Sequence, residues 1–392
     1  MELSHKKKLF RISTVPISLN ILLKGQLRYL NQYYDITGIS SPGEDLDAVA
    51  EREGIRTRSI CIERKISPLK DLRALYLLYK YFKKEQPYIV HSITPKAGLL
   101  SMLAAKFAGI PIRMHTFTGL IFPSKNGILQ SILILMDRLL CRCATNIYPE
   151  GLGVKKDLIQ YKITSKPLKV IANGNINGID TSFFNPLLFS SSQQQSLKKE
   201  LNINENDFVF IFVGRLVSDK GINELIKAFD NINQKYTEVK LLLVGPLESN
   251  LDPLKEETLD VINKNKHIIS IGWQSDVRPY FAISDALVFP SYREGFPNVV
   301  MQAGAMGLPA IVTNINGCNE IIEEGNNGTI IPSKNAMVLE DKMIKFVVDK
   351  NYLQQLRLNA REMIISRYEQ KKVWEALLEE YKALEKRYKK DV

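Results

Sequence analysis

Five continuous apolar runs in the second half of the chain constrain its fold more than any other feature. Each is rich in β-branched residues, a composition typical of strands buried on both faces of a parallel sheet. The runs are FVFIFVG at 208–214, VKLLLVG at 239–245, HIISIG at 267–272, ALVFPS at 286–291 and PAIVTN at 309–314. Three of them end in glycine, which lets the backbone turn tightly and lets a ligand approach the end of a strand. The runs therefore predict a parallel sheet whose carboxyl edge binds a ligand.

The first half repeats this alternation with shorter strands. Strand patterns occur at 8–15, 36–40, 56–62 and 88–92, and the segment at 67–86 between two of them has helical spacing. Alternating strands and helices predict a doubly wound parallel sheet, that is, a Rossmann-like fold. The sequence therefore predicts an α/β protein with two such domains, whose ligand-binding edges enclose a central cleft.

The chain is also long enough for two domains. It has 392 residues, 45% of them hydrophobic, which exceeds what one core usually needs. A polar segment with a Ser-Gln run at 185–200 predicts a linker between a first domain at 1–184 and a second domain at 201–370. Residues 371–392 have the pattern of an amphipathic helix with a basic end, which we expect to pack back on the first domain.

Charge and cysteine usage narrow the possible partners. Residues 1–185 hold 27 Lys+Arg and 14 Asp+Glu, a net charge of +13, whereas the remainder holds 26 and 28, a net of −2. A basic half suits anionic lipid headgroups or a polyphosphorylated substrate. No helix-turn-helix, zinc-finger or RNP-type signature points to nucleic acid. Four scattered cysteines indicate reduced thiols in a cytoplasmic protein. No signal-peptide pattern and no apolar stretch of spanning length are found.

Two cations follow the first strand of the second series. The stretch VGRLVSDKG at 213–221 places Arg215 and Lys220 five residues apart in a glycine-bounded loop that leads into a helix. Two positive charges at one strand end suit a diphosphate, which needs neutralisation as it becomes a leaving group. The loop is no Walker A motif. Two surface cations beside a turn are the structural alternative.

A helix entrance follows the strand at 286–291. In EGFPNVVMQAGAMG, Pro297 is placed like the first residue of a helix, whose first-turn amides and dipole favour an anion. Glu294 precedes that turn and can accept hydrogen bonds from sugar hydroxyls. Gln302 lies in the helix, where its amide can reach a ribose. A solvated loop acid is the alternative for Glu294.

These spaced motifs resemble the family 4 retaining glycosyltransferases of the GT-B fold across essentially the whole second half. The resemblance implies that Arg215 and Lys220 hold the donor diphosphate and that Glu294 contacts the donor sugar. The family's second glutamate corresponds to Gln302. A glutamine keeps one hydrogen bond to a ribose hydroxyl but lacks the charge-assisted bonds of a carboxylate, so we expect weaker nucleotide binding with activity retained.

The resemblance also predicts the rest of the donor site. The base is expected beside IGWQSDVRPY at 271–280, with Trp273 and Val277 as its contacts, although a core or lid role is the alternative for the tryptophan. Uridine diphosphate is the commoner family donor, and we expect it here. The other predicted donor-binding residues are Gly214, Gly245, Gly295, Phe296, Pro297, Asn298 and Val299.

The first half resembles the acceptor domain of bacterial enzymes that build capsule or O-antigen on polyprenyl carriers. His115 follows the run PIRM, where the family has a histidine near the donor sugar, so we assign it a catalytic role beside Arg215, Lys220 and Glu294. A buried structural histidine is the alternative. Acceptor contacts are predicted for Lys96, Thr118 and the loop at 15–26, whose amides and one cation suit a pyrophosphate. The loop contributes Asn20, Lys24 and Gly25.

The predicted reaction is same-face transfer to a lipid-linked saccharide without a protein nucleophile, a cofactor or a metal, since no Asp-x-Asp motif is suitably placed. The apolar stretch GILQSILILM at 127–136 lies near Lys125, Arg138 and Arg142 and could dip into an anionic membrane surface, which predicts a peripheral protein on the inner face of the cell membrane. A core helix is the alternative. Two other functions stay open: a nucleotide-sugar 2-epimerase and a non-catalytic sugar-nucleotide-binding protein.

Overall fold

A computed structural model describes residues 6–248 and 252–390 of the chain. It contains two compact units. The first comprises residues 1–178 and 370–392, and the second comprises residues 179–369. Each unit is built around one six-stranded parallel sheet. When the strands of each unit are counted from its first strand, the two sheets have the same strand order, 3-2-1-4-5-6. The expectation of two doubly wound α/β domains therefore holds at the level of the fold.

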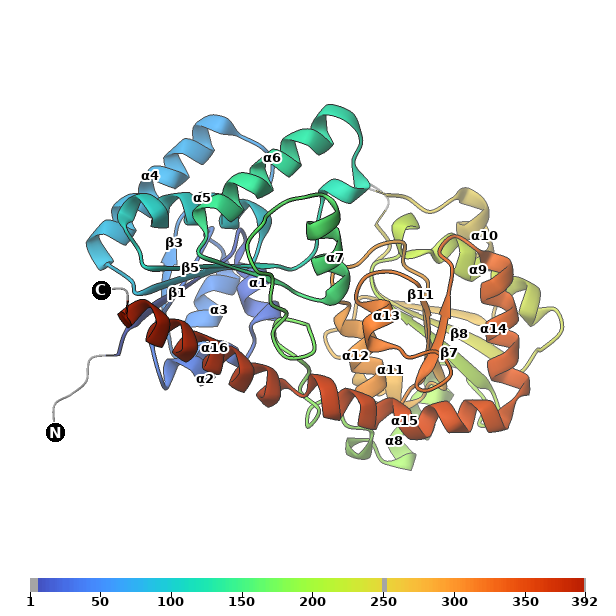
Figure 1. Ribbon diagram of the computed structural model, residues 1–392. Coiled ribbons are helices and arrows are strands. Elements are labelled where there is room, and N and C mark those ends of the chain that lie inside the picture. Colours follow the sequence, from blue (N-terminus) through green and yellow to red (C-terminus); the bar gives the residue numbers. More distant parts are fainter. Residues whose placement is uncertain (1–5, 249–251, 391–392) are drawn as a thin grey trace. The chain divides into compact units, whose positions relative to one another are not determined.

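The sheet of the first unit has the order β3-β2-β1-β4-β5-β6. Its strands are β1 (Lys8–Ile12), β2 (Asp35–Ser40), β3 (Arg56–Ser59), β4 (Ile89–Ser92), β5 (Ile112–Phe117) and β6 (Asn146–Pro149). Its helices are α1 (Pro16–Leu22), α2 (Gln26–Asn31), α3 (Glu44–Glu53), α4 (Pro68–Glu85), α5 (Pro95–Ala108), α6 (Gly127–Cys143), α7 (Leu152–Gln160) and α16 (Gln370–Lys390). Helices α4, α5 and α6 lie on one side of this sheet, and α2, α3 and α16 lie on the other (Figure 1).

The sheet of the second unit has the order β12-β11-β10-β7-β8-β9. Its strands are β7 (Phe208–Val213), β8 (Val239–Val244), β9 (Ile268–Gly272), β10 (Ala286–Phe289), β11 (Ala310–Thr313) and β12 (Gly328–Ile331). Its helices are α8 (Ser191–Glu200), α9 (Ile222–Asn233), α10 (Glu256–Lys264), α11 (Arg278–Ala282), α12 (Asn298–Ala305), α13 (Cys318–Ile321), α14 (Ala336–Val348) and α15 (Lys350–Tyr368). The strand order reverses between β7 and β10, which is where open α/β sheets bind their ligands.

The predicted linker at 185–200 is not a linker. Its second part forms helix α8, which begins with a capping box in which Ser190 and Gln193 satisfy each other's backbone N–H groups. The helix belongs to the second unit, where Leu197 packs against the core. The segment was predicted to be a linker because its composition is polar. It forms a helix nevertheless, and this helix has only a narrow apolar face. The chain leaves the first unit at Gly178 instead.

The last helix belongs to the first unit. Leu377, Leu378, Tyr381 and Leu384 of α16 lie in the same core as residues of α1, α2 and α3. Gly25 lies so close to α16 that a Cβ atom there would come within 2.7 Å of the Trp374 ring. The Trp374 indole also donates a hydrogen bond to Asn177, 2.7 Å away. Residues 370–390 therefore complete a core that the first 178 residues leave open.

A buried polar chain fixes α16 to the sheet. The Arg11 guanidinium donates to the Tyr381 hydroxyl at 2.8 Å, and this hydroxyl lies 2.6 Å from Nδ1 of His91. Nε2 of His91 lies 2.8 Å from the Thr116 hydroxyl. A neutral His91 that is protonated at Nε2 satisfies these contacts, with the Tyr381 hydroxyl donating to Nδ1. Burial, together with the nearby Arg11 and His115, places the pKa of His91 well below its ordinary value.

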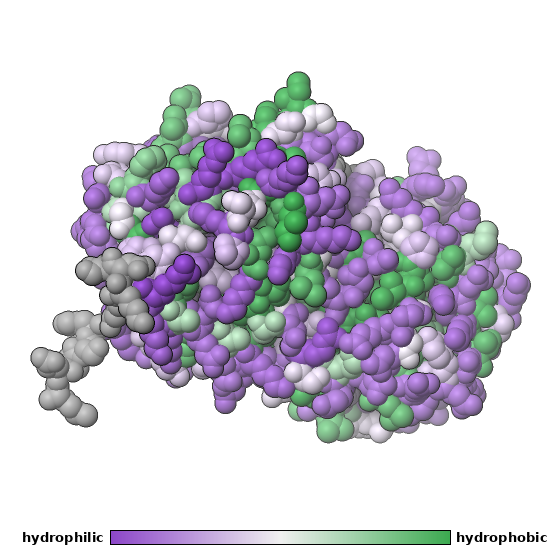
Figure 2. All heavy atoms as spheres, in the orientation of Figure 1, coloured by the Kyte–Doolittle hydropathy of each residue, from purple (hydrophilic) through white to green (hydrophobic). Residues whose placement is uncertain are grey.

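The surface of the first unit carries large exposed side chains over α4 and α6. Leu69, Leu72 and Tyr76 of α4 and Ile128 and Leu135 of α6 are each at least 60% exposed. Figure 2 shows hydrophobic side chains gathered at the surface over these two helices. In the described part of the chain, no helix is both long and apolar enough to cross a membrane. The segment at 127–136 is thus a surface helix rather than a core helix.

Candidate functional site

The predicted donor residues of the second unit gather at the carboxyl ends of β7 and β10, where the strand order reverses. Lys220 follows β7 and Glu294 follows β10, and their side chains form an ion pair. Each side chain is 17% exposed. The structure therefore brings together a cation and a carboxylate that lie 74 positions apart in the sequence, at the edge where a ligand is expected.

Neighbouring groups hold the carboxylate of Glu294 in place. The Ser291 hydroxyl donates to it at 2.9 Å, and the Thr313 hydroxyl donates to the Ser291 carbonyl oxygen. Cys318 is fully buried nearby, and burial together with the negative charge of Glu294 raises the pKa of its thiol well above the ordinary value. The Glu294 side chain is thus held in one position by its neighbours. It is not the solvated loop acid that the sequence left open as the alternative.

Arg215 lies in the same loop as Lys220 but is more open. Its side chain is 47% exposed, and one guanidinium nitrogen donates to Glu248 at 2.8 Å. Two further pairs surround the site: Arg293 with Asp219 at 2.9 Å, and the Tyr292 hydroxyl with Glu224 at 2.6 Å. The sequence pattern gave no sign of these pairs, because their members come from different loops.

Glycines allow these loops to approach one another closely. A Cβ atom on Gly245, the residue after β8, would lie 1.9 Å from the carbonyl oxygen of Gly214, the residue after β7. A Cβ atom on Gly221, which has φ +72°, would lie 2.1 Å from the carbonyl oxygen of Pro290. No side chain fits at either place, so the loops after β7, β8 and β10 can only pack this tightly with glycine there.

Helix α12 begins beside this cluster. Pro297 is its N-cap rather than its first residue, and the N–H of Val300 donates to the Pro297 carbonyl oxygen at 3.2 Å. Phe296 and Pro297 are buried, whereas Gly295, Asn298 and Val299 are half-buried. Gln302 lies in the second turn and is half-buried, and no hydrogen bond of its side chain to another described residue is found. Its amide is therefore available to a ligand.

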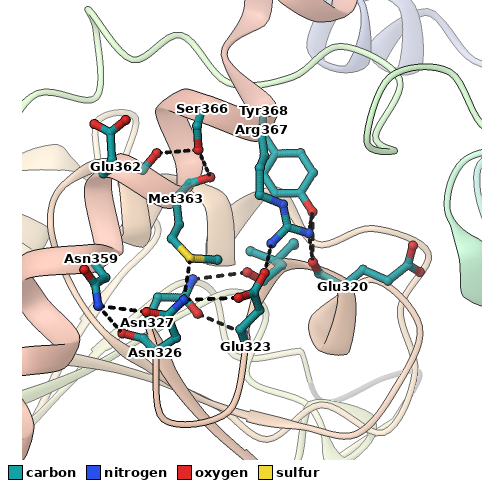
Figure 3. A network of polar contacts seen from close by, with 11 residues as sticks. Glu320, Glu323, Asn326, Asn327, Asn359, Glu362, Met363, Ser366, Arg367 and Tyr368 are labelled. Carbon is teal, nitrogen blue, oxygen red and sulfur yellow. Dashed lines mark hydrogen bonds and ion pairs between the residues drawn. The ribbon is translucent and has the colours of Figure 1, made fainter.

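A second polar network supports the segment that precedes helix α12. Gly317 packs against Gly295 and Pro297, where a Cβ atom would meet backbone at 2.6 Å. The segment that follows Gly317 is tied to α15, because the Tyr368 hydroxyl donates to the Glu320 carbonyl oxygen at 2.9 Å and Arg367 pairs with Glu323 (Figure 3). Asn359 of the same helix contacts Asn326 at 2.8 Å. Helix α15 thus fixes the loop on which the entrance to α12 rests.

The two residues predicted to hold the base differ in exposure. Trp273, just after β9, is 70% exposed, so it is not a core residue. Val277 is half-buried, packs against the core and forms the N-cap of α11. Both lie beyond the ends of β8 and β9, on the same edge of the sheet as Gly245.

The prediction that His115 is catalytic is wrong. Its imidazole is fully buried in β5, with Nδ1 2.8 Å from the Ser92 hydroxyl and the ring edge-on to Phe117. A Cβ atom on Gly98 would lie 2.5 Å from the imidazole, so α5 packs directly against it. Burial lowers the pKa of His115 to about 3, which keeps the ring neutral. It is a structural histidine, the alternative that the sequence left open.

The loop at 15–26, predicted to bind a pyrophosphate, uses several of its polar groups for contacts within the first unit. The Gly25 N–H donates to the buried carboxylate of Glu53 at 3.0 Å, so this amide is already used. The Asn20 side chain is held by Asp45 at 2.6 Å and by Arg52. The Lys24 carbonyl oxygen accepts from Asn177 and Gln370. These residues fasten the loop to α3 and α16.

Lys96 and Thr118 remain at the strand ends of the first unit. Lys96 is 11% exposed and forms an ion pair with Asp71 at 2.6 Å, and it lines a cavity of about 390 Å³. The Thr118 hydroxyl donates to the Ile93 carbonyl oxygen at 2.9 Å. The same cavity is lined by Asp137, which the sequence analysis missed because its position within the apolar helix α6 carries no motif.

Within residues 6–248 and 252–390, no group of three or more His, Cys, Asp and Glu side chains is placed to hold a metal ion. The expectation that transfer needs no metal stays a prediction.

Comparison with known proteins agrees with this fold and this arrangement of loops. Residues 193–363 match the family model of glycosyl transferases group 1, and residues 15–150 match that of glycosyl transferase 4-like proteins. The capsular polysaccharide biosynthesis glycosyltransferase CapM of Staphylococcus aureus is 31% identical over 373 residues, which cover 95% of this chain and 96% of CapM.

A second relative from Escherichia coli is a UDP-Gal:α-D-GlcNAc-diphosphoundecaprenol α-1,3-galactosyltransferase, 29% identical over 77% of each chain. Among solved structures, that of Anabaena HepE in complex with UDP matches with a TM-score of 0.81 and 18% identity and covers 96% of this chain and all of HepE. Sucrose-phosphate synthase of Thermosynechococcus elongatus matches with a TM-score of 0.78 and 17% identity over 97% of this chain and 99% of its own.

The two parallel six-stranded sheets and the likeness to these solved structures show a GT-B fold. The chain belongs to the family 4 glycosyltransferases. Its relatives and both family models are named as glycosyltransferases, so the epimerase and the non-catalytic alternatives find no support in them.

Proposed function

We propose that the chain transfers a hexose or an N-acetylhexosamine, with retention, from a UDP-sugar to a polyprenyl-diphosphate-linked saccharide in the synthesis of a surface polysaccharide. The observation that carries this proposal is the Lys220–Glu294 pair at the ends of β7 and β10. It supplies a cation for a diphosphate and a fixed carboxylate for sugar hydroxyls within one site. The named reaction of the Escherichia coli relative supports the choice of donor and acceptor.

The chemistry assigned to the site is electrostatic. The bond from the anomeric carbon to the diphosphate oxygen breaks, and the acceptor hydroxyl oxygen bonds to that carbon on the same face. The departing diphosphate oxygen takes the hydroxyl proton. Lys220 and Arg215 stabilise the negative charge that develops on the diphosphate, while Glu294 orients the sugar. Lys220 is half-buried, which strengthens its interaction with the diphosphate, because water screens a buried charge less than an exposed one.

A donor screen tests this proposal. Purified protein is heated with UDP-, GDP- and ADP-sugars, and we expect a raised melting temperature with a UDP-sugar because the ligand binds only the folded state. A ligand at 100 times its Kd adds about 2.7 kcal/mol of stability. The Arg215→Ala variant should lose most of the shift, whereas Lys235→Ala, which changes an exposed lysine of the same unit, should keep it. A shift with GDP- or ADP-sugars alone would contradict the choice of uridine.

The substitution Gln302→Glu is expected to tighten UDP binding roughly three- to tenfold, because a carboxylate makes stronger, charge-assisted hydrogen bonds to ribose hydroxyls than an amide does. Titration calorimetry with UDP measures the change. Gln354→Glu adds the same charge to an exposed position of α15 and should leave the Kd unchanged. Equal or weaker binding in Gln302→Glu would show that this amide does not face the ribose.

We further propose that α4 and α6 rest on an anionic membrane surface. The exposed Leu69, Ile128 and Leu135 offer apolar contact, and the net charge of +13 in residues 1–185 favours anionic headgroups. Sedimentation with vesicles tests this. We expect binding to anionic but not to zwitterionic vesicles, and about tenfold weaker binding for Leu135→Glu. Leu358→Glu on α15, which is 71% exposed in the wild type, is the matched control. Equal binding of both variants would sink this proposal.

A further inference from the structure

A cavity of about 390 Å³ opens at the strand ends of the first unit. Thr14 follows β1, Thr94 follows β4 and Gly119 lies just beyond β5, and all three line it. Helix α6 closes another side with Leu133, Met136 and Asp137. Its volume lies within the range of about 300–1,000 Å³ that is typical of small-molecule sites. All residues that line the cavity belong to the first unit.

The walls of this cavity are mainly apolar, with polar groups at a few points. The Thr14 and Thr94 hydroxyls lie 2.8 Å apart and present oxygen atoms at the sheet edge. Lys96, paired with Asp71, and the exposed Arg64 also line the cavity. Apolar faces with a few fixed polar groups are the usual makeup of a site for a small organic molecule, and a sugar ring offers both kinds of surface.

Asp137 is the unexplained member of the lining. It is half-buried, and no hydrogen bond or ion pair joins its carboxylate to another described residue. Burial raises the pKa of Asp137 to about 7. A carboxylate without a partner in an apolar setting destabilises the protein, so its presence within the apolar helix α6 indicates a use other than folding. Two further charged residues, Arg64 and Lys96, line the same cavity, and the Cys141 thiol lies one turn further along α6.

We propose that this cavity binds the sugar next to the diphosphate of the lipid-linked acceptor and that Asp137 accepts a hydrogen bond from one of its hydroxyls. This inference rests on the proposed function for the class of acceptor, and it adds a site and a positioning residue that no motif indicates. The hydroxyls of Thr14 and Thr94 contact the opposite edge of the sugar, and Leu133 and Met136 contact its apolar face. The exposed guanidinium of Arg64, which also lines the cavity, suits the diphosphate.

Equilibrium binding tests the proposal without requiring turnover. The probes are undecaprenyl-diphosphate N-acetylglucosamine and undecaprenyl diphosphate without a sugar, both in detergent. We expect Asp137→Asn to weaken binding of the sugar-bearing probe about tenfold, because an amide replaces a charge-assisted acceptor, and to leave the other probe unaffected. Asp47→Asn, the same change at an exposed position of α3, is the control. The melting temperature of each variant verifies that it is folded.

A pH series provides a second readout. Affinity of the wild type for the sugar-bearing probe should rise from pH 6 to pH 8, since ionisation makes Asp137 a better acceptor, and the rise should vanish in Asp137→Asn. UDP-sugar affinity should not change in this variant, so a failed donor screen and a failed acceptor site can be told apart. No binding of the sugar-bearing probe by the wild type, or equal loss of both probes in Asp137→Asn, would overturn the proposal.

Discussion

Lys220→Met is expected to lower kcat/KM for sugar transfer by about 10²–10³, because removing one preorganised charge from a developing anion has an effect of this size. The lysine lies where the strand order reverses and is 17% exposed, so its charge is only partly screened by water. Methionine has a similar length and apolar stem, which limits any change in packing. Transfer from the donor found by the screen is measured at several donor concentrations.

The control for this prediction is Lys227→Met, which alters an exposed lysine of α9 in the same unit and should leave kcat/KM within twofold. Lys220→Arg should recover only part of the activity, because the planar guanidinium differs from an ammonium in size and geometry. A Lys220→Met enzyme with kcat/KM within threefold of the wild type would show that this lysine does not stabilise the departing diphosphate.

Acidification from pH 7 to pH 5 is expected to cost the first unit about 4 kcal/mol through His91 and His115, about 2 kcal/mol each, while Asp137, whose pKa burial raises to about 7, takes up a proton in the folded state and offsets about 2 kcal/mol of this loss. Both histidines are buried and neutral in the folded chain, with the pKa of His115 at about 3 and that of His91 well below its ordinary value. In the unfolded chain they take up protons as the pH falls through about 6.5. At these two sites the unfolded state then binds more protons than the native state, so their contribution to stability is lost below that pH and is unaffected above it.

Urea unfolding followed by the fluorescence of Trp374 measures this loss, because that tryptophan packs on Gly25 within the first unit. Trp273 belongs to the second unit and is replaced by phenylalanine in the reference protein to remove its signal. His115→Asn should reduce the loss of stability between pH 7 and pH 5 by about 2 kcal/mol. An unchanged difference in that variant would mean that other groups cause the acid sensitivity.

The parts of the structure that the sequence predicted are those fixed by local patterns. Continuous apolar runs marked the strands of the second sheet, and the loop motifs marked Arg215, Lys220 and Glu294, whose approach follows from parallel strands ending at one edge. Errors arose where the deciding contact comes from elsewhere in the chain. The sequence around Gly25 resembles a ligand-binding turn, but in the structure its N–H donates to Glu53 and the Trp374 ring packs against it.

His115 and Asp137 both show that the local sequence does not reveal how a side chain is packed. The histidine has a suggestive position near a strand end, but α5 covers it completely. The aspartate carries no motif, and its significance lies in the absence of a partner among the described residues, which only packing reveals. The effect of burial on an ionisable group cannot be read from its neighbours in sequence.

The two-part make-up of the first unit bears on how the chain is synthesised. The second unit is one continuous segment, residues 179–369, so all its strands have been synthesised before α16 is translated. The first unit must wait for Tyr381 and its neighbours on α16, which fill its core and contact Arg11. Although domains usually fold in order of synthesis, here the nascent first unit, still exposing Leu19 and Leu27, would be the one in need of a chaperone.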